Sequence, residues 1–382
     1  MKSIALLGVI CASFACADPA FTQDSGVTKN LFASSGVCKE CHADIHSFWK
    51  NSMHAFSYSD PIFKTAYEKA MKISQEAKAL CLQCHAPATQ LNRDYEMQYE
   101  VTREGVTCDF CHVVIAVTRA SENFAYKFNL DRTRVGPLRN ADSPIHASAY
   151  SELHTKSEIC AGCHEYTNPA GVRLLETYSE WKQSPYAAEG VQCQGCHMPI
   201  GEGYVVRPGV RQSPKGINLH NLQGGHSIDK VKMAAKVRIS DIQKFHEGAR
   251  ITVEVTNTGS GHRIPTGTPS RELLLEISLL SVSANQLIQK KELVFDKTLT
   301  DKHGRILDGD AEIMLSAGRI LSDTRIWPRE TRTSQFTFVG LPSNLYRIRA
   351  KLYYNYIAET SPGQVQQMLV EMVSDEKPIS IE

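Results

Sequence analysis

The pentapeptide Cys38-Lys39-Glu40-Cys41-His42 carries the pattern that decides how this chain folds. The same Cys-x-x-Cys-His spacing occurs five times within the first 197 residues, and the other four copies begin at Cys81, Cys108, Cys160 and Cys193. With 12 cysteines and 14 histidines in 382 residues, chance produces only about 0.01 such pentapeptides. The repetition therefore specifies a chemical attachment rather than a packing preference.

The spacing matches the covalent attachment of haem. Two thiols must add to the two vinyl groups of one porphyrin, and the next histidine must turn its imidazole onto the iron as the proximal ligand. We therefore predict five covalently bound c-type haems, with thioether bonds at Cys38, Cys41, Cys81, Cys84, Cys108, Cys111, Cys160, Cys163, Cys193 and Cys196. The predicted proximal ligands of the haem irons are His42, His85, His112, His164 and His197.

The two remaining cysteines, Cys11 and Cys16, fall in a segment typical of a secretory signal. A lysine precedes an apolar run from Ile4 to Phe14, and small residues flank Cys16. We expect residues 1–17 to be removed and the protein to be exported, to the periplasm or to the cell surface. A lipid anchor at Cys16 is the competing interpretation, although the bulky Phe14 is a poor lead-in for it.

The charge of the chain indicates which partners to expect. Its formal net charge is +1 at pH 7, and the ten propionates of five haems bring the reduced protein to about −10. This argues against nucleic acid and favours redox protein partners with basic docking patches. After the signal segment, no stretch reaches the roughly 18 apolar residues of a membrane-spanning helix, so we expect no membrane span.

The composition changes near residue 230 and divides the chain into two predicted domains. Residues 18–230 hold all ten motif cysteines and 11 of the 14 histidines. Short helices and loops are expected there, for example a helix that starts at Asp60-Pro61 and loops over 123–143 and 201–216. So few elements cannot bury enough surface alone, and we predict a core made largely of porphyrin.

Residues 231–382 contain no cysteine and show the alternation of β-strands. Ile251, Val253 and Val255 alternate with polar residues, and 346–356 alternate in the same way. We predict at least six strands, at 236–242, 251–256, 273–281, 288–299, 333–340 and 346–356. The predicted fold class is therefore α+β in two parts, a haem-packed region followed by an all-β immunoglobulin-like sandwich.

The haem region also repeats itself. Residues 49–55 are matched by 181–187, and a Glu-Gly-Val triplet precedes both Cys108 and Cys193. A duplicated two-haem unit with one extra haem explains this pattern. Tyr186 stands where the first copy has His54, so the two copies use that position differently.

Several segments together resemble the multihaem c-type cytochromes that accept electrons from hydroxylamine oxidoreductase, which have relatives in dissimilatory metal reduction. The resemblance covers most of the chain and rests on the haem motifs and on the segments 49–54, 193–199, 220–226 and 261–267. It implies that the distal iron ligands are His54, His146, His220, His226 and His262. It also implies that His262 fixes the sandwich onto the haem array.

Alternatives remain open for some of these histidines. His154, eight residues after His146, competes with it as a ligand. His220 and His226 lie in a glycine-rich turn, which is also what a backbone needs to pass close to a porphyrin. His262 can also be read as a polar turn residue.

The function that we predict is an exported penta-haem carrier of electrons between redox partners, in anaerobic respiration or extracellular electron transfer, rather than an enzyme. Two imidazoles on each iron favour fast transfer and low reduction potentials. One alternative is a multihaem reductase with one open catalytic haem that acts on a nitrogen or sulfur oxyanion. Another is a homo-oligomeric subunit of a conductive filament.

Overall fold

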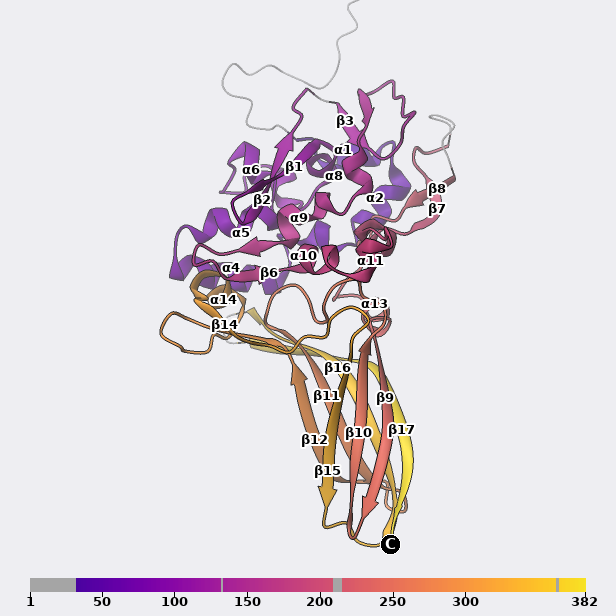
Figure 1. The fold of residues 1–382 in the computed structure, drawn as a ribbon. Coiled ribbons are helices and arrows are strands. Elements are labelled where there is room, and N and C mark those ends of the chain that lie inside the picture. The colour runs from indigo at the N-terminus through magenta and orange to yellow at the C-terminus, as the bar shows by residue number, and fades with distance from the viewer. Residues whose placement is uncertain (1–31, 132, 209–214, 362–363) are drawn as a thin grey trace, which may run out of the picture.

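The computed structural model describes residues 32–131, 133–208, 215–361 and 364–382. The chain forms two parts, a region of short helices and an elongated β-sandwich below it in the view of Figure 1. This confirms the predicted α+β class. The predicted signal segment, with Cys11 and Cys16, lies outside the described residues.

The first part is built from short helices joined by loops and small strand pairs. Its helices are α1 (Ser35–Lys39), α2 (Ala43–Trp49), α3 (Met53–Phe56), α4 (Pro61–Ile73), α5 (Ala77–His85), α6 (Thr89–Asn92), α7 (Glu100–Arg103), α8 (Cys108–His112), the 3-10 turn η1 (Glu152–Thr155), α9 (Glu158–His164), α10 (Thr177–Lys182), α11 (Pro185–Ala188), α12 (Cys193–His197) and α13 (Ile228–Lys232). Its strands are β1 (Val114–Ala120), β2 (Asn123–Phe128), β3 (Arg134–Gly136), β4 (Ser148–Tyr150), β5 (Tyr166–Thr167), β6 (Arg173–Leu175), β7 (Ile200–Tyr204) and β8 (Lys215–Asn218).

The longest of these helices, α4, begins where the sequence predicts it. The Asp60 side chain accepts a hydrogen bond from the Phe63 amide, and Pro61 occupies the first turn, where its missing N–H costs nothing. Phe63 and Ala70 are buried on the face that turns inward. The helix therefore presents a fixed apolar wall to the interior.

Two segments predicted to be loops contain strands. Asn123–Phe128 forms strand β2 and pairs antiparallel with β1, and Ile200–Tyr204 forms β7, which pairs with β8. The prediction was wrong at these places because the pairing partner, rather than the local pattern, supplies the backbone hydrogen bonds.

The second part is a sandwich of two antiparallel sheets. Its elements are β9 (Ala235–Phe245), β10 (Gly248–Asn257), β11 (Arg271–Ser281), β12 (Gln286–Phe295), β13 (Lys297–Thr300), α14 (Asp310–Ser316), β14 (Arg319–Asp323), β15 (Thr331–Val339), β16 (Asn344–Ser361) and β17 (Gln364–Ile381). One sheet has the order β15-β10-β9 and the other β12-β11-β16-β17. Strand β17 is absent from the predicted set, and the predicted strand 288–299 is divided between β12 and β13.

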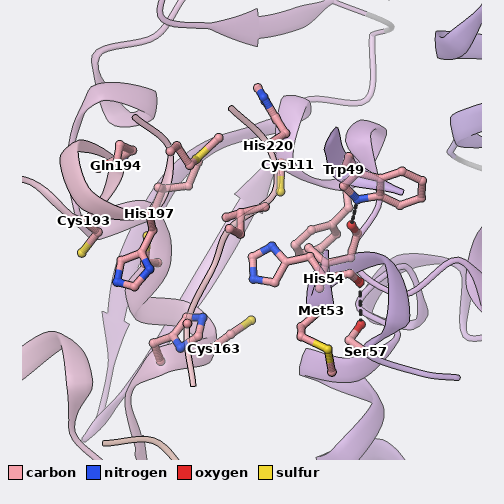
Figure 2. Close-up of a pocket in the computed structure, with 18 of the residues that line it drawn as sticks. Trp49, Met53, His54, Ser57, Cys111, Cys163, Cys193, Gln194, His197 and His220 are labelled. Carbon is pink, nitrogen blue, oxygen red and sulfur yellow. Dashed lines mark hydrogen bonds between the residues drawn. The ribbon is translucent and has the colours of Figure 1, made fainter. Parts of the chain in front are cut away.

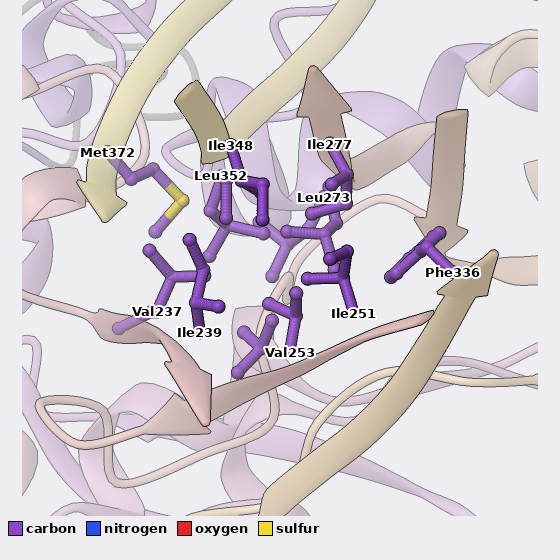
Figure 3. Close-up of a cluster of buried hydrophobic side chains, with 14 of the residues drawn as sticks. Val237, Ile239, Ile251, Val253, Leu273, Ile277, Phe336, Ile348, Leu352 and Met372 are labelled. Atoms are coloured by element: carbon purple, nitrogen blue, oxygen red, sulfur yellow. The ribbon is translucent and has the colours of Figure 1, made fainter. Parts of the chain in front are cut away.

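The two sheets face each other across one hydrophobic core. Figure 3 shows Val237, Ile239, Ile251 and Val253 of one sheet opposite Leu273, Ile277, Ile348 and Leu352 of the other. These positions alternate along each strand, as the sequence predicts, because successive side chains point to opposite faces. The sandwich thus has an apolar core of its own.

A tyrosine stabilises the connection between β15 and β16 of this sandwich. The Tyr346 hydroxyl, near the start of β16, donates a 2.8 Å hydrogen bond to the Pro342 carbonyl four residues earlier. This is the tyrosine corner found in immunoglobulin-like sandwiches. It supports the predicted sandwich type by a feature independent of strand number.

Buried charges connect the two parts. Lys297, on β13, is almost fully buried, and its ammonium lies 2.5 Å from a Glu176 carboxylate oxygen of the first part. Arg325 forms ion pairs with Glu176, Glu180 and Asp323. The pairs with Glu176 and Glu180 cross from the helical part to the sandwich, so they fix the orientation of one part on the other.

Candidate haem-binding cavity

The helical part encloses a cavity of about 2230 Å³ that the end of the sandwich closes. This is at least about twice the volume of a pocket for one drug-sized ligand, which reaches about 1,000 Å³. All ten motif cysteines line it, and none of these ten is in a disulfide. The cavity therefore has the size and the thiols for several covalently attached cofactors.

The motifs lie on short helices that aim their side chains into this cavity. Four of the five motifs fall entirely within α5, α8, α9 and α12, and the first spans the end of α1 and the turn before α2. On a helix, the first cysteine, the second cysteine three residues later and the histidine four residues later share one face. Each motif therefore presents two thiols and one imidazole together.

Backbone carbonyls fix the orientation of four motif histidines. The Nδ1 atoms of His42 and His85 lie 2.6 and 2.8 Å from the carbonyl oxygens of Val205 and Ser57. The Nδ1 atoms of His112 and His197 make the corresponding contacts at 2.7 and 2.6 Å. Donation by Nδ1–H leaves Nε2 with a free lone pair, which is the usual arrangement of a metal-ligating histidine. Local sequence could not predict these acceptors because any residue carries a carbonyl.

Burial favours the neutral form of several imidazoles in the cavity. Burial lowers the pKa of His164 to about 3 and of His197 to about 4. Burial also lowers the pKa of His54 and His220 to about 4. A neutral ring is the form that can give a nitrogen lone pair to a metal ion.

Each of three motif histidines faces a different predicted distal histidine across a gap. The ring centroids of His42 and His146 are 6.3 Å apart, and those of His164 and His54 are also 6.3 Å apart. For His197 and His262 the separation is 6.4 Å. Figure 2 shows His54, His197 and His220 in the cavity among Cys111, Cys163 and Cys193. The structure thus brings together residues that are between 65 and 110 positions apart in the sequence.

The spacing of these three pairs fits one iron between each two rings. With bonds of about 2.0 Å from metal to nitrogen and about 1.1 Å from nitrogen to ring centroid, two imidazoles on one iron have centroids about 6.2 Å apart. Rings in ordinary van der Waals stacking lie closer, as Phe63 and His85 do at 3.7 Å. The residues present therefore fit the group that the motifs imply.

The surroundings of His112 are different. Its ring stacks on His154 with centroids 5.5 Å apart, which is too close for an iron between them. His154 Nε2 lies 3.0 Å from the Cys111 carbonyl, and its Nδ1 is buried without a hydrogen-bond partner among the described residues. His220 is also an electrostatic neighbour of His112, and its Nδ1 lies 2.6 Å from the Asn218 carbonyl, so its Nε2 is free.

Among the described residues, the His85 ring forms no ring pair with another imidazole. His226 lines the same cavity, and both histidines feel the charge of Asp60. Phe63 stacks on the face of the His85 ring and fixes its plane. His226 thus shares a cavity and an acidic neighbour with the histidine of the second motif.

The internal repeat is visible in the contacts of two tryptophans. Trp49 Nε1 donates a 2.8 Å hydrogen bond to the Val106 carbonyl, and Trp181 Nε1 donates one of equal length to the Val191 carbonyl. Both acceptors belong to the Glu-Gly-Val triplets that precede a haem motif. The same bond thus anchors corresponding motifs in the two copies.

Tyr186, which replaces the histidine of the first copy, faces the sandwich. Its hydroxyl donates a 3.0 Å hydrogen bond to the Thr258 carbonyl, and Arg329 lies over its ring. A Cβ on Gly261 would be 3.5 Å from the Tyr186 ring, so the tyrosine packs beside the residue that precedes His262. In the second copy, this position supports the sandwich loop that carries a histidine.

Contacts between thiols order the motifs in space. Cys38 of the first motif lies against Cys108 of the third, and Cys111 of the third motif feels the charge of Cys163 of the fourth. The fourth motif also contacts the second through Cys84 and the fifth through Cys160 and Cys193. The motifs therefore form a row from the first through the third to the fourth, which branches to the second and the fifth.

Comparison with known proteins agrees with this geometry. Residues 37–113, which hold the first three motifs, match the family described as "Cytochrome c554 and c-prime". The fold is similar to that of a penta-haem cytochrome c552 from Thermochromatium tepidum, with a TM-score of 0.71 and 24% identity over 91% of this chain and 99% of that one. Comparison with curated proteins gave no match.

A second solved structure matches only the sandwich region. It is the CARDB domain of the PF1109 protein from Pyrococcus furiosus, with 12% identity, a TM-score of 0.20, and coverage of 39% of this chain and 86% of that domain. That TM-score is too low to support a conclusion about this chain.

The motifs, the family match over residues 37–113 and the similar fold together support a multihaem c-type cytochrome with covalently bound haem. Among solved structures, the penta-haem cytochrome c552 matches it over nearly the full length of both chains. No helix among the described residues is long and apolar enough to cross a membrane.

Proposed function

We propose that this protein is an exported penta-haem electron carrier that links redox partners in anaerobic respiration or delivers electrons to an extracellular acceptor. The single observation that carries the proposal is the set of three facing imidazole pairs, whose centroids are 6.3 to 6.4 Å apart. A site closed by protein ligands on both sides of the iron suits electron transfer better than substrate binding.

Each iron has two proposed imidazole ligands. Three pairs have ring centroids 6.3 to 6.4 Å apart: His42 with His146, His164 with His54, and His197 with His262. For the other two irons we propose His112 with His220 and His85 with His226. The ten motif cysteines would hold the five porphyrins through thioether bonds. When bound, each haem supplies a one-electron couple between ferric and ferrous iron.

The chain's own contribution is to fix the orientation of these imidazoles and to bury them. Carbonyl acceptors fix the Nδ1 atoms of four motif histidines, and burial favours the neutral ring of His197. Ligands that do not move when the charge changes keep the reorganisation energy small, which favours rapid electron transfer. Two imidazoles without a methionine also favour low potentials.

Residues 18–230 form the proposed haem domain and residues 231–382 the proposed sandwich domain. His262, from the loop after β10, is a proposed ligand to the iron of the fifth motif. The sandwich would then act as a lid that is fixed by an iron ligand as well as by the buried ion pairs. The chain has a formal net charge of only +1, so the ten negative propionates of five haems would make the protein acidic and would favour partners with basic docking patches. Export is supported by residues 1–17, which have the pattern of a signal segment.

Mass spectrometry and spin-state spectroscopy of the purified protein test this proposal together. We expect five covalent haems per chain, and low-spin ferric signals that added cyanide does not change. Fewer than five haems would overturn the count. A high-spin ferric signal that cyanide converts would instead support the alternative of a reductase with one open haem.

The filament alternative predicts a different oligomeric state. Light scattering of the purified protein gives a discrete small species for a carrier and large polydisperse species for a filament subunit.

A further inference from the structure

Arg271, at the first position of β11, reaches from the sandwich into the haem cavity. Its Nη1 donates a 3.3 Å hydrogen bond to the Thr266 carbonyl, and its Nε is shielded from solvent and has no acceptor among the described residues. Its guanidinium carbon lies 5.6 Å from the centre of the Tyr356 ring. The planar fork of this side chain is therefore only partly used by the protein.

No carboxylate of the described residues forms an ion pair with Arg271. The nearest acidic neighbours include Asp310, whose two oxygens accept hydrogen bonds of 2.5 and 2.8 Å from the Ser270 and Tyr356 hydroxyls. An arginine stays charged at every physiological pH, and a buried cation without a counter-ion is costly. Arg271 feels the charges of Asp310 and Asp60 without direct contact, so its guanidinium keeps N–H donors that an anion in the cavity can use.

A second donor points at the same place. A Cβ built on Gly225 would lie 2.8 Å from the Tyr354 hydroxyl and 3.5 Å from Arg271 Nη1, so the two donors converge beside the residue that precedes His226. Gly267, with φ +92°, brings a second loop against the guanidinium, where a Cβ would be 2.6 Å from Nη1. Burial raises the pKa of Tyr354, so its hydroxyl keeps its proton. Glycine at both positions lets the two loops approach the donors this closely, because a Cβ at either position would clash with Tyr354 or Arg271.

The position of this cluster relates it to two motif histidines. Arg271 acts electrostatically on His226 and on His164, and Asp310 acts on His85. The guanidinium thus lies near His226 and the histidine of the fourth motif, and its neighbour Asp310 lies near the histidine of the second. A fork of parallel N–H donors with a hydroxyl beside it matches the two oxygens of a carboxylate.

We propose that Arg271 and Tyr354 form a binding site for a carboxylate or a similar planar oxyanion within the haem cavity. The inference rests on the proposed function, because the cavity is that of the haems. The anion is either a propionate of a haem attached to this chain or a small free oxyanion that enters from solvent. Both sources satisfy the same donors, and they differ in their response to added anion.

Redox titration of the haem-loaded protein, followed by visible spectroscopy at constant ionic strength, tests the site. The variants are Arg271→Met and Tyr354→Phe, and Arg238→Met is the matched control because it removes the same charge from an exposed pair with Glu254 on the outside of the sandwich. Each protein is measured without and with added sodium acetate or sodium nitrite.

If the anion is a propionate, Arg271→Met shifts one haem potential to more negative values, because an uncompensated carboxylate near the iron favours the ferric state. Tyr354→Phe shifts it less in the same direction, Arg238→Met leaves it unchanged, and added anion has no effect. If the anion is free, the wild-type potentials or spectrum respond saturably to acetate or nitrite, and Arg271→Met weakens this binding at least tenfold.

Potentials of Arg271→Met and Tyr354→Phe that equal those of the control, together with no saturable anion effect, overturn the proposal. Should Arg271→Met fail to accumulate, Arg271→Lys keeps the charge and loses the fork, and the shift is then expected to be smaller but present. A haem count below five in the wild-type protein would be a failure of the proposed function rather than of this site.

Discussion

Single imidazoles control the chemistry proposed for this cavity. A motif histidine is placed by its helix and oriented by one backbone carbonyl, as for His42 and Val205. Its partner arrives from a distant loop, as His146 does. Since each iron is proposed to depend on two individual side chains, single substitutions give clear spectroscopic tests.

Replacing His54 by alanine is expected to convert one haem to the high-spin state while the other four stay low-spin. His54 faces His164 at 6.3 Å, so its removal opens one axial position. Spin-resonance and visible spectra of the ferric protein measure the change. The control is His46→Ala, because His46 stacks on Trp49 and is not one of the proposed ligands. A high-spin signal in His46→Ala rather than in His54→Ala would contradict the pairing.

Replacing His220 by alanine is expected to open the iron of the third motif, whereas His154→Ala leaves every haem low-spin. The reason is that His154 is hydrogen-bonded at Nε2 to the Cys111 carbonyl and stacks too closely on His112. Cyanide binding, followed in the visible spectrum, distinguishes the variants. The opposite result, with cyanide bound only by His154→Ala, would assign the iron to His154.

Helices and strands place these residues at the next scale. The motif helices each form from a few residues and depend on tertiary contacts, such as the bond from Trp181 to the Val191 carbonyl. The sandwich strands are long and pair through continuous ladders, of which β16 with β17 is the longest. The sandwich therefore carries a stable core that does not depend on porphyrin.

Tyr346→Phe is expected to destabilise the sandwich by about 1–2 kcal/mol, because the Pro342 carbonyl loses a buried donor. Urea unfolding monitored by far-ultraviolet circular dichroism measures the loss. Tyr353→Phe is the matched control on the same strand, where the side chain is only half-buried and water replaces the lost contact. Equal stability of the two variants would show that the corner contributes nothing.

At the scale of the whole molecule, the two parts are joined by buried charges and by apolar clusters such as Val172 and Leu174 against Leu299. Glu176→Gln is expected to cost about 3–5 kcal/mol, because Lys297 and Arg325 are then buried beside each other without that carboxylate. Urea unfolding of the haem-loaded protein measures the cost. Glu189→Gln also breaks a pair between the parts, with Arg329, but both side chains are about half exposed and the expected loss is below about 1 kcal/mol.

The same contact predicts how stability depends on pH. Burial opposes ionisation of Glu176, but the Lys297 ammonium outweighs it, and the pKa of the carboxyl lies below its ordinary value of 4.5. A carboxyl with a lowered pKa in the folded state stabilises the fold above that ordinary value, and the contribution is lost as the pH falls through the lower pKa. We expect the stability difference between wild type and Glu176→Gln to shrink below about pH 4.5. A difference that is constant from pH 7 to pH 3 would contradict this.

Local signals in the sequence were sufficient for the haem attachment motifs, the start of α4 at Asp60, and the alternating strands of the sandwich core. Each of these depends on residues within one or two turns or along one strand, where covalent geometry sets the spacing. The strands at 123–128 and 200–204 could not be predicted in the same way, because their hydrogen bonds come from partners elsewhere in the chain.

By itself the sequence predicted how many porphyrins are attached and at which thiols, since five neighbouring residues carry that chemistry. Only the tertiary structure decided which imidazoles face one another, where His154 and Tyr186 turn, and that Arg271 enters the cavity from the sandwich. The physical reason is that a ligand pair joins segments up to about a hundred residues apart, and their meeting depends on the packing of the whole chain rather than on any local pattern.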